Sequence, residues 1–226
     1  MAIRTEHGRL QTPLVGYAGR DDLDRQLVGD IYANFAKVER WPQLVRSHAA
    51  LPLQKALEES GLGLHLVCCG APEGGKMLAS HLGAATGCEY VHPEKIVLKP
   101  KTETSREKSE LRFTGRHELF MGSRVLIVED VCNNFSTTAQ LIDEIESRGC
   151  EVVGIACVLN RSPTYRSEFL QGSRRWPVLS LWNEPFPEYQ QDDPHVADDI
   201  AAGNIVWKPK EEWERLKERA DPYAFL

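Results

Sequence analysis

The chain has 226 residues, of which 42% are hydrophobic and 27% charged, so it can bury a sizeable core in one α/β domain with a smaller appendage. The net charge of −6 argues against a protein whose main task is to coat nucleic acid or an anionic membrane, but it allows a small anionic ligand. The sequence contains no apolar run that approaches the roughly 20 residues of a membrane span. We therefore expect a cytoplasmic protein that binds neither nucleic acid nor membrane.

The six cysteines lie in contexts that argue against a disulfide framework. Cys68 and Cys69 are adjacent in the apolar run "LHLVCC", and Cys157 lies in the apolar run "VVGIACVL". Neither context suits disulfides in a chain of this length, and no CxxC pair offers a zinc site. We predict reduced, mostly buried thiols.

Two helical regions are expected before the core begins. In residues 21–39, apolar side chains recur four positions apart after an acidic residue, which predicts an amphipathic helix. The apolar positions are Leu23, Leu27, Ile31 and Phe35, and the cap is Asp21 or Asp22. The second region, residues 42–60, should be interrupted near Pro52 and should end at Gly61.

Strands and helices alternate from residue 64 onward. Strands are expected at 64–69, 88–92, 124–131 and 151–159, and helices at 76–86 and 136–149. Continuous apolar strands that alternate with helices predict an α/β fold with a parallel sheet covered on both faces. We divide the chain into an N-terminal helical segment (1–62), an α/β core (63–176) and a C-terminal cap (177–226) that contains a short strand and a helix.

The segment "VLIVEDVCNNFSTTAQLI" combines a buried strand, two acidic residues and a helix that begins near Ser136. In an open parallel sheet, ligands bind at the carboxyl ends of the strands, where loops lead into helices. The hydroxyl groups of Ser136, Thr137 and Thr138 and the free amides of the helix can face an anion. The carboxylates of Glu129 and Asp130 can accept hydrogen bonds from sugar hydroxyls or help to hold a hydrated Mg²⁺. The alternative is that Ser136 only caps the helix and that the acidic pair is solvated.

The run "VLIVEDV", in which five residues separate the acidic pair from "STT", resembles the phosphoribosyl pyrophosphate (PRPP) motif of type I phosphoribosyltransferases. This resemblance implies that Glu129 and Asp130 bind the ribose hydroxyls, and that Asp130 reaches Mg²⁺ mostly through water and PRPP. It also implies that residues 133–138 wrap the 5′-phosphate; these are Asn133, Asn134, Phe135, Ser136, Thr137 and Thr138.

The loop departs from the family pattern at Asn133, Asn134 and Phe135, which stand where Thr or Asp, then Thr or Ala, then Gly are usual. Glycine permits a positive φ and a close backbone approach, whereas the Cβ of phenylalanine disfavours both. Asparagine tolerates the left-handed conformation better. We therefore expect Asn134 to take the turn, so that Phe135 points outward or packs on a neighbouring element.

Three further segments match the family in order. "GAPEGG" before Lys76 resembles the pyrophosphate loop, whose residues would be Ala71, Pro72, Glu73, Gly74 and Gly75. The charged segment from residue 99 to 112 has the position of a mobile loop that closes over PRPP, with Lys99, Lys101, Arg106 and Lys108 as the candidate catalytic cations. "VLNRSPTYR" resembles the segment in which orotate-type enzymes place an arginine near the base, which would be Arg161.

The resemblance implies a Rossmann-like parallel-sheet core with a small hood built from the N- and C-terminal segments, and a homodimer. It implies a Mg²⁺-dependent phosphoribosyltransferase that converts PRPP and a nucleobase, orotate in the first instance, to a nucleoside 5′-monophosphate and pyrophosphate. Two alternatives stay open, which are a non-catalytic PRPP or nucleotide sensor with the same fold and a phosphoribosyltransferase for purines. Phe135 and the atypical mobile loop favour the sensor, whereas the acidic pair and the "APEGG" loop favour the enzyme.

Overall fold

The computed structural model describes residues 13–63, 66–72, 74–99 and 108–219. The chain forms two compact units, one built from residues 1–34 and 186–226 and the other from residues 35–185. Among the described helices, none combines the length and the apolar character needed to cross a membrane.

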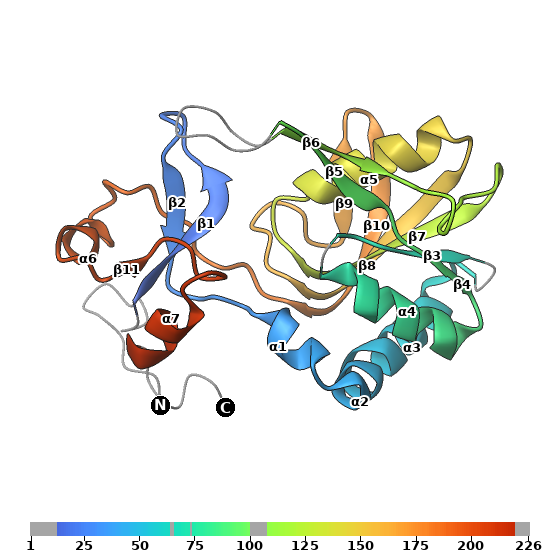
Figure 1. Cartoon of the computed structure of the whole chain (residues 1–226), viewed down its shortest axis with the longest axis horizontal. Helices are drawn as coiled ribbons and strands as arrows, with labels where there is room; N and C mark the ends of the chain where they lie inside the picture. Colours follow the sequence, from blue (N-terminus) through green and yellow to red (C-terminus); the bar gives the residue numbers. More distant parts are fainter. Residues whose placement is uncertain (1–12, 64–65, 73, 100–107, 220–226) are drawn as a thin grey trace. The chain divides into compact units, whose positions relative to one another are not determined.

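The central sheet of the second unit has six strands in the order β4-β3-β7-β8-β10-β9 (Figure 1). Neighbouring strands are parallel except for β9, which pairs antiparallel with β10. The strands are β3 (Val67–Gly70), β4 (Glu89–Val91), β7 (Arg124–Cys132), β8 (Glu151–Asn160), β9 (Glu168–Gln171) and β10 (Arg174–Asn183). The predicted α/β fold with a mostly parallel sheet is confirmed.

Both faces of this sheet are covered, as the continuous apolar strands predict. Along β7, Val125 and Ile127 belong to one core cluster, and Leu126 and Val128 belong to the other. Helix α5 (Ser136–Ser147) packs on the first face. Helices α3 (Leu51–Ser60) and α4 (Gly75–Thr86) pack on the second face, as Figure 1 shows.

The second predicted helical region is confirmed, with a change of winding before its proline. Helix α1 (Phe35–Glu39) is followed by α2 (Pro42–Val45), by a π-helical turn η1 (Arg46–Ala50) and by α3. The winding changes just before Pro52, which lacks an N–H and whose ring crowds the preceding turn of helix. The helix ends at Gly61, which has a φ of 77°.

The predicted helix over residues 21–39 is wrong, except for its last turn, which is α1. The chain instead forms an antiparallel pair of strands, β1 (Leu14–Arg20) and β2 (Gln26–Gly29). The Asp21 carboxylate accepts hydrogen bonds from the amides of Leu23 and Arg25 and from the Arg25 guanidinium, so it stabilises a turn instead of capping a helix.

The remaining elements of the first unit include the short strand and the helix expected in the C-terminal segment. Strand β11 (Ile205–Val206) pairs parallel with β1 to make a three-stranded sheet in the order β11-β1-β2. Helix α7 (Trp213–Arg219) follows it, and the short helix α6 (Ala197–Ala201) precedes it.

Both ends of the charged segment 99–112, which is predicted to be a mobile loop, belong to a two-stranded ribbon. Strand β5 (Glu94–Lys99) pairs antiparallel with β6 (Lys108–Arg112), and residues 100–107 between them lie outside the described part of the chain. The two strands join the end of β4 to the segment that leads into β7.

All six cysteines are free, and all but Cys88 are buried, which confirms the predicted thiols. Burial and the neighbouring Cys88 raise the pKa of Cys68 to about 12, so this thiol stays protonated at neutral pH.

Candidate functional site

The candidate site lies at the carboxyl edge of the sheet, where β7 and β8 end side by side and the neighbouring β3 ends four residues before the end of β7. Gly70 at the end of β3 is paired with Val128 of β7, and Cys132 at the end of β7 is paired with Asn160 at the end of β8. The loops that follow these three strands contain the pyrophosphate-loop segment, the segment 133–138 and Arg161. The sheet therefore brings together three segments that are far apart in sequence.

The loop 71–75 lies directly against the end of β7. The Ala71 amide donates to the Val128 carbonyl oxygen at 2.9 Å. A Cβ at Gly75 would lie 2.0 Å from that same oxygen, and a Cβ at Gly74 would lie 2.3 Å from the Asp130 carboxylate. Glycine is required at both positions, because any larger residue would push the loop away from the acidic pair.

Two backbone amides of the loop 71–75 already donate hydrogen bonds within the protein, so they are not available to bind an anion. Besides the bond from Ala71, the Gly75 amide donates to the Ala71 carbonyl oxygen at 3.0 Å. Pro72 has no N–H, and Glu73 lies outside the described residues. Gly74 is therefore the described loop residue whose amide is placed to meet an anion, together with the first amides of α4.

In the segment 133–138, the left-handed backbone conformation that was expected at Asn134 occurs at Phe135. Phe135 itself adopts the left-handed conformation, with φ 58° and ψ 19°, at the N-cap of α5. Asn134 instead uses its side chain, whose Oδ1 accepts a hydrogen bond from the Ser136 amide at 3.1 Å. The prediction that Asn134 takes the left-handed turn is wrong, because the loop keeps the backbone shape of a glycine at residue 135.

The ring of Phe135 explains how the strained backbone is held. It is 3% exposed and stacks on Phe169 of β9, with ring centroids 5.0 Å apart and planes 9° apart. Tyr165 meets it edge-on at 5.4 Å. The expectation that Phe135 packs on a neighbouring element is confirmed, and the ring lies in the core, away from the surface of the loop that a phosphate would contact.

The hydroxyl residues at the start of α5 differ in accessibility. Ser136 is exposed and Thr137 is half-buried, whereas Thr138 is 1% exposed. Asn133 precedes them and is half-buried. Ser136 and Thr137 are thus the hydroxyl groups that an external anion can reach.

Arg161 lies immediately after β8 and is 7% exposed. Its amide donates to the Cys132 carbonyl oxygen at 2.9 Å, which fixes the residue next to the end of β7. The preceding Asn160 is fully buried and donates its side-chain amide to the carbonyl oxygens of Tyr165 and Arg166. The Arg161 loop is therefore held by buried hydrogen bonds.

The candidate cations of the hairpin are only partly within the described chain. Lys99 ends β5 and Lys108 begins β6, and the two residues are paired across the ribbon. Lys101 and Arg106 lie outside the described residues. The ribbon thus places the two described lysines at the start and end of the segment 100–107.

Sequence reasoning missed Glu39, at the end of α1. Burial and the nearby Asp130 carboxylate raise the pKa of Glu39, so this carboxyl group lies close to the acidic pair. Its Oε1 is buried and has no hydrogen-bond partner among the described residues. The position gave no signal in the sequence, because Glu39 lies 91 positions before Asp130, in a helix without a recognisable motif.

The acidic residues fit a magnesium ion that is only partly held by protein. Glu39 and Asp130 are oxygen donors near enough for their charges to interact, and Oε1 of Glu39 is buried with no hydrogen-bond partner in the described part of the chain. Within the described ranges, no group of three or more His, Cys, Asp or Glu residues could hold a metal ion. Magnesium bound here would therefore take most of its ligands from water and substrate.

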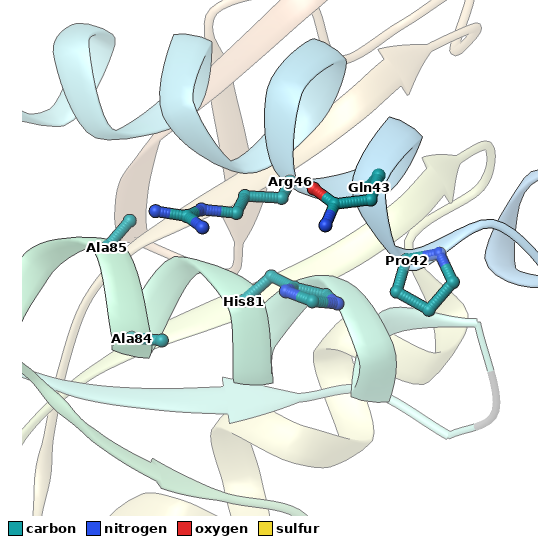
Figure 2. Close-up of a pocket in the computed structure, with 6 residues that line it drawn as sticks. All are labelled: Pro42, Gln43, Arg46, His81, Ala84 and Ala85. Atoms are coloured by element: carbon teal, nitrogen blue, oxygen red, sulfur yellow. The ribbon is translucent and has the colours of Figure 1, made fainter.

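A pocket of about 350 Å³ opens elsewhere, between α2, η1 and α4. Figure 2 shows Gln43 and Arg46 facing His81 of α4 across this space. The residues from α4 lie six or more positions beyond Gly75, in the second half of the helix. This pocket is therefore separate from the carboxyl edge of the sheet.

Known proteins resemble this chain in sequence and in fold. Two relatives are named orotate phosphoribosyltransferase: one from Nitratiruptor is 28% identical over 137 residues, and one from Wolinella succinogenes is 26% identical over 132 residues. The solved structure of Leishmania donovani UMP synthase matches 91% of this chain and 39% of its own, with a TM-score of 0.54 and 15% identity. The chain therefore has the α/β fold of type I phosphoribosyltransferase structures and resembles orotate phosphoribosyltransferases in sequence.

The match to the curated relatives has a limited extent. It covers 60% and 58% of this chain, and 61% and 58% of the two relatives. The chain thus spans about three fifths of the length of the curated relatives it matches. No family model matches it. The fold of this chain follows from the structural match, whereas its activity and substrates have to be argued from the site.

Phe135 gives a direct test of what holds the backbone of the segment 133–138. Phe135→Ala should lower the free energy of unfolding by about 3–5 kcal/mol through loss of the buried ring. Phe135→Gly should lose about 1 kcal/mol less, because glycine relieves the left-handed strain. Urea unfolding of both variants measures the difference. Phe120→Ala, at an exposed phenylalanine, is the control and should be near neutral; equal losses for Phe135→Ala and Phe120→Ala would contradict this packing.

Proposed function

We propose that this protein is a phosphoribosyltransferase that uses PRPP and orotate and releases pyrophosphate. The observation that carries the proposal is the contact between Gly74 and the Asp130 carboxylate. The loop proposed to bind the diphosphate then lies beside the carboxylates proposed to bind the sugar hydroxyls. A ribose that carries a diphosphate requires both groups side by side. The accessible start of α5 supplies a second anion site on the same edge.

Each segment has a task in the proposed reaction. Glu129 and Asp130 accept hydrogen bonds from the ribose hydroxyls, and the amides at Gly74 and the start of α4 bind the diphosphate. Residues 133–137 surround the 5′-phosphate, with Ser136 and Thr137 donating from their hydroxyl groups. Positioning and charge stabilisation supply the rate, so the reaction needs no nucleophilic side chain.

The hairpin supplies the proposed catalytic cations. Lys99 and Lys108, with Lys101 and Arg106 between them, would neutralise the charge that develops on the leaving pyrophosphate as the C1–O bond of the ribose breaks. The sugar becomes oxocarbenium-like, and a nitrogen of the base forms the new bond to C1. The antiparallel ribbon supports this role because it brings Lys99 and Lys108 together.

We propose Mg²⁺ as the cofactor. Asp130 and Glu39 would hold the ion, with water and PRPP oxygens as its other ligands. The ion would neutralise phosphate charge and favour departure of pyrophosphate. The unpartnered Oε1 of Glu39 supports this assignment.

Two observations support orotate as the base. Both curated relatives described above are named orotate phosphoribosyltransferase. Arg161 is fixed by its amide at the edge that β7 and β8 share, and a planar guanidinium suits a carboxylate partner. A purine base would not supply that carboxylate.

The proposal extends to assembly and location. We propose a homodimer, supported by exposed apolar side chains at Trp41, just before α2, at Leu44 of α2 and at Leu51 of α3. The six free thiols suit a reducing compartment, and we propose the cytoplasm.

Pyrophosphate release tests the activity. The purified protein is mixed with PRPP, Mg²⁺ and, in turn, orotate, uracil, adenine and guanine, and pyrophosphate is followed. We expect pyrophosphate to be released when the added base is orotate, and not with uracil, adenine or guanine. Asp130→Asn should raise the KM for PRPP about tenfold or more, because hydrogen bonds to a charged group contribute about 1.5–3 kcal/mol. Saturable PRPP binding without pyrophosphate release for any base would contradict the enzyme hypothesis and favour the sensor. Pyrophosphate release with adenine or guanine would show that the base is a purine and not orotate.

Glu39→Gln separates the magnesium role from activity. At pH 7 without Mg²⁺ the variant should have a higher Tm, because the raised pKa means that folding disfavours the ionised carboxylate. This gain should vanish below the ordinary carboxyl pKa, where Glu39 is protonated in both states. The Mg²⁺ concentration needed for half-maximal PRPP binding should rise about tenfold. Glu59→Gln, at an exposed carboxylate on α3, should change neither quantity; unchanged Mg²⁺ dependence in Glu39→Gln would remove Glu39 from the ion site.

Arg161→Gln tests the choice of base. Loss of a charge-assisted hydrogen bond to the orotate carboxylate should raise the KM for orotate about tenfold or more, with the KM for PRPP unchanged. Arg166→Gln, at an exposed arginine in the same loop, is the matched control. An unchanged KM for orotate in a folded Arg161→Gln variant would exclude this role.

A further inference from the structure

Three aromatic rings pack together where β4 leads into the hairpin. His92, just after β4, stacks on Tyr90 with centroids 5.6 Å apart, and the Tyr90 hydroxyl group bonds its Nδ1 at 2.9 Å. His117, which follows β6, lies with its ring centroid 3.8 Å from that of His92. The bond to Tyr90 occupies Nδ1 and leaves Nε2 as the nitrogen of His92 that can meet a ligand. The cluster joins the two ends of the hairpin and fixes the His92 ring.

The strand register places His92 beside the pyrophosphate loop. Val91 is paired with Cys69, so the next residues on the two strands, His92 and Gly70, are neighbours. Gly70 is packed against the start of α4, because a Cβ there would lie 2.7 Å from the Cα of Lys76. His92 and Lys76 therefore flank Gly70 at the edge where the diphosphate is proposed to bind.

His92 and Lys76 also lie on the same face of the sheet. Tyr90 packs against the core cluster that contains Leu78 and Leu82 of α4. Its stacking with His92 places the imidazole on that face too. Lys76 belongs to the first turn of α4 and is half-buried.

The charges at this place favour an anion. A lysine in the first turn of a helix is opposed by the positive end of the helix dipole. Burial, His117 and Lys76 lower the pKa of His92, and Glu94 of β5 opposes this shift. In addition, Nδ1 of His117 is buried and has no hydrogen-bond partner among the described residues. His92 thus lies among Lys76, His117 and Glu94 in surroundings that disfavour its protonated form, and a bound anion would reverse this preference.

We propose that Lys76 and His92, with His117 behind His92, form an anion subsite beside the pyrophosphate loop that takes up a proton when a diphosphate binds. The ligand is the diphosphate group of PRPP or free pyrophosphate, so the inference rests on the proposed function. Lys76 contributes a fixed positive charge. His92 gains its proton from solvent, and the imidazolium donates a hydrogen bond from its Nε2–H group to a phosphate oxygen.

The direction of the pH effect follows from this coupling. Without ligand, His92 is mostly neutral at pH 7, because its pKa lies below the ordinary value. A bound diphosphate stabilises the imidazolium and raises that pKa. Affinity should therefore increase as the pH falls from 7.5 toward 6, by at most about tenfold per pH unit for one proton. The groups that face His92 are Tyr90, His117, Lys76 and Glu94.

Calorimetry measures the proton directly. Mg²⁺ and inorganic pyrophosphate are titrated into the full chain at pH 7 in two buffers with different ionisation enthalpies. The protonation of pyrophosphate itself is common to all variants, so the difference between wild type and His92→Gln isolates the side chain. We expect His92→Gln to lose up to one proton of uptake and Lys76→Met to bind about tenfold more weakly.

His81→Gln is the matched control, because His81 also lies on α4 but lines the separate pocket in Figure 2. It should retain the wild-type proton uptake. Should His92→Gln not fold, the imidazole resonances of the wild-type protein are titrated by NMR, and one pKa should rise when pyrophosphate is added.

The outcomes separate the two proposals. Binding of PRPP and pyrophosphate with equal proton uptake in wild type and His92→Gln, or with no imidazole pKa raised, overturns the subsite and leaves the proposed function intact. Absence of binding by either ligand to the wild-type protein overturns both.

Discussion

The close approach of the loop 71–75 to the end of β7 is the constraint on which the site depends. Two consecutive glycines permit it, since side chains there would meet the Val128 carbonyl oxygen and the Asp130 carboxylate. The approach has a structural basis in the parallel pairing of β3 with β7, in which Gly70 at the end of β3 lies beside Val128, two residues before Asp130. A shift of that register by one residue would separate the loop from the acidic pair.

Charge is divided along this edge. The carboxylates of Glu39, Glu129 and Asp130 belong to the end of β7 and its surroundings, whereas Lys76 and His92 belong to the β3–β4 side. Strands β4 and β7 flank β3, so they are about 10 Å apart at the usual strand spacing. A sugar with hydroxyl groups at one end and a diphosphate at the other matches this division. The overall charge of −6 therefore hides a site with both signs.

Local patterns predicted the parts of the fold that local chemistry decides. The apolar strands, the helix after Gly75 and the helix stop at Gly61 all follow from side-chain type and backbone freedom. The helix predicted over residues 21–39 is mostly wrong, because apolar residues four positions apart also fit two strands joined by a tight turn. There, the turn made by the Asp21 carboxylate prevailed over the helical spacing.

The parts of the site that the sequence did not reveal are contacts between distant residues. Glu39 reaches Asp130 only because α1 belongs to the same unit as the sheet. His92 meets His117 because β5 and β6 pair and bring their flanking residues together. A positive φ is sterically unfavourable for a residue with a Cβ, so the sequence argued against it at Phe135. In the folded protein, burial of the Phe135 ring outweighs this steric cost.

The stack of Phe135 on Phe169 ties the first turn of α5 to a strand at the far edge of the sheet. A glycine at this position would leave the loop free to sample many backbone states, and a ligand would have to select one of them. With the ring anchored, that conformational entropy is lost during folding instead of during binding. The loop is therefore preorganised before a ligand binds. Substitutions at Phe169, although this residue lies on β9 and outside the loop, should make the proposed anion site less rigid.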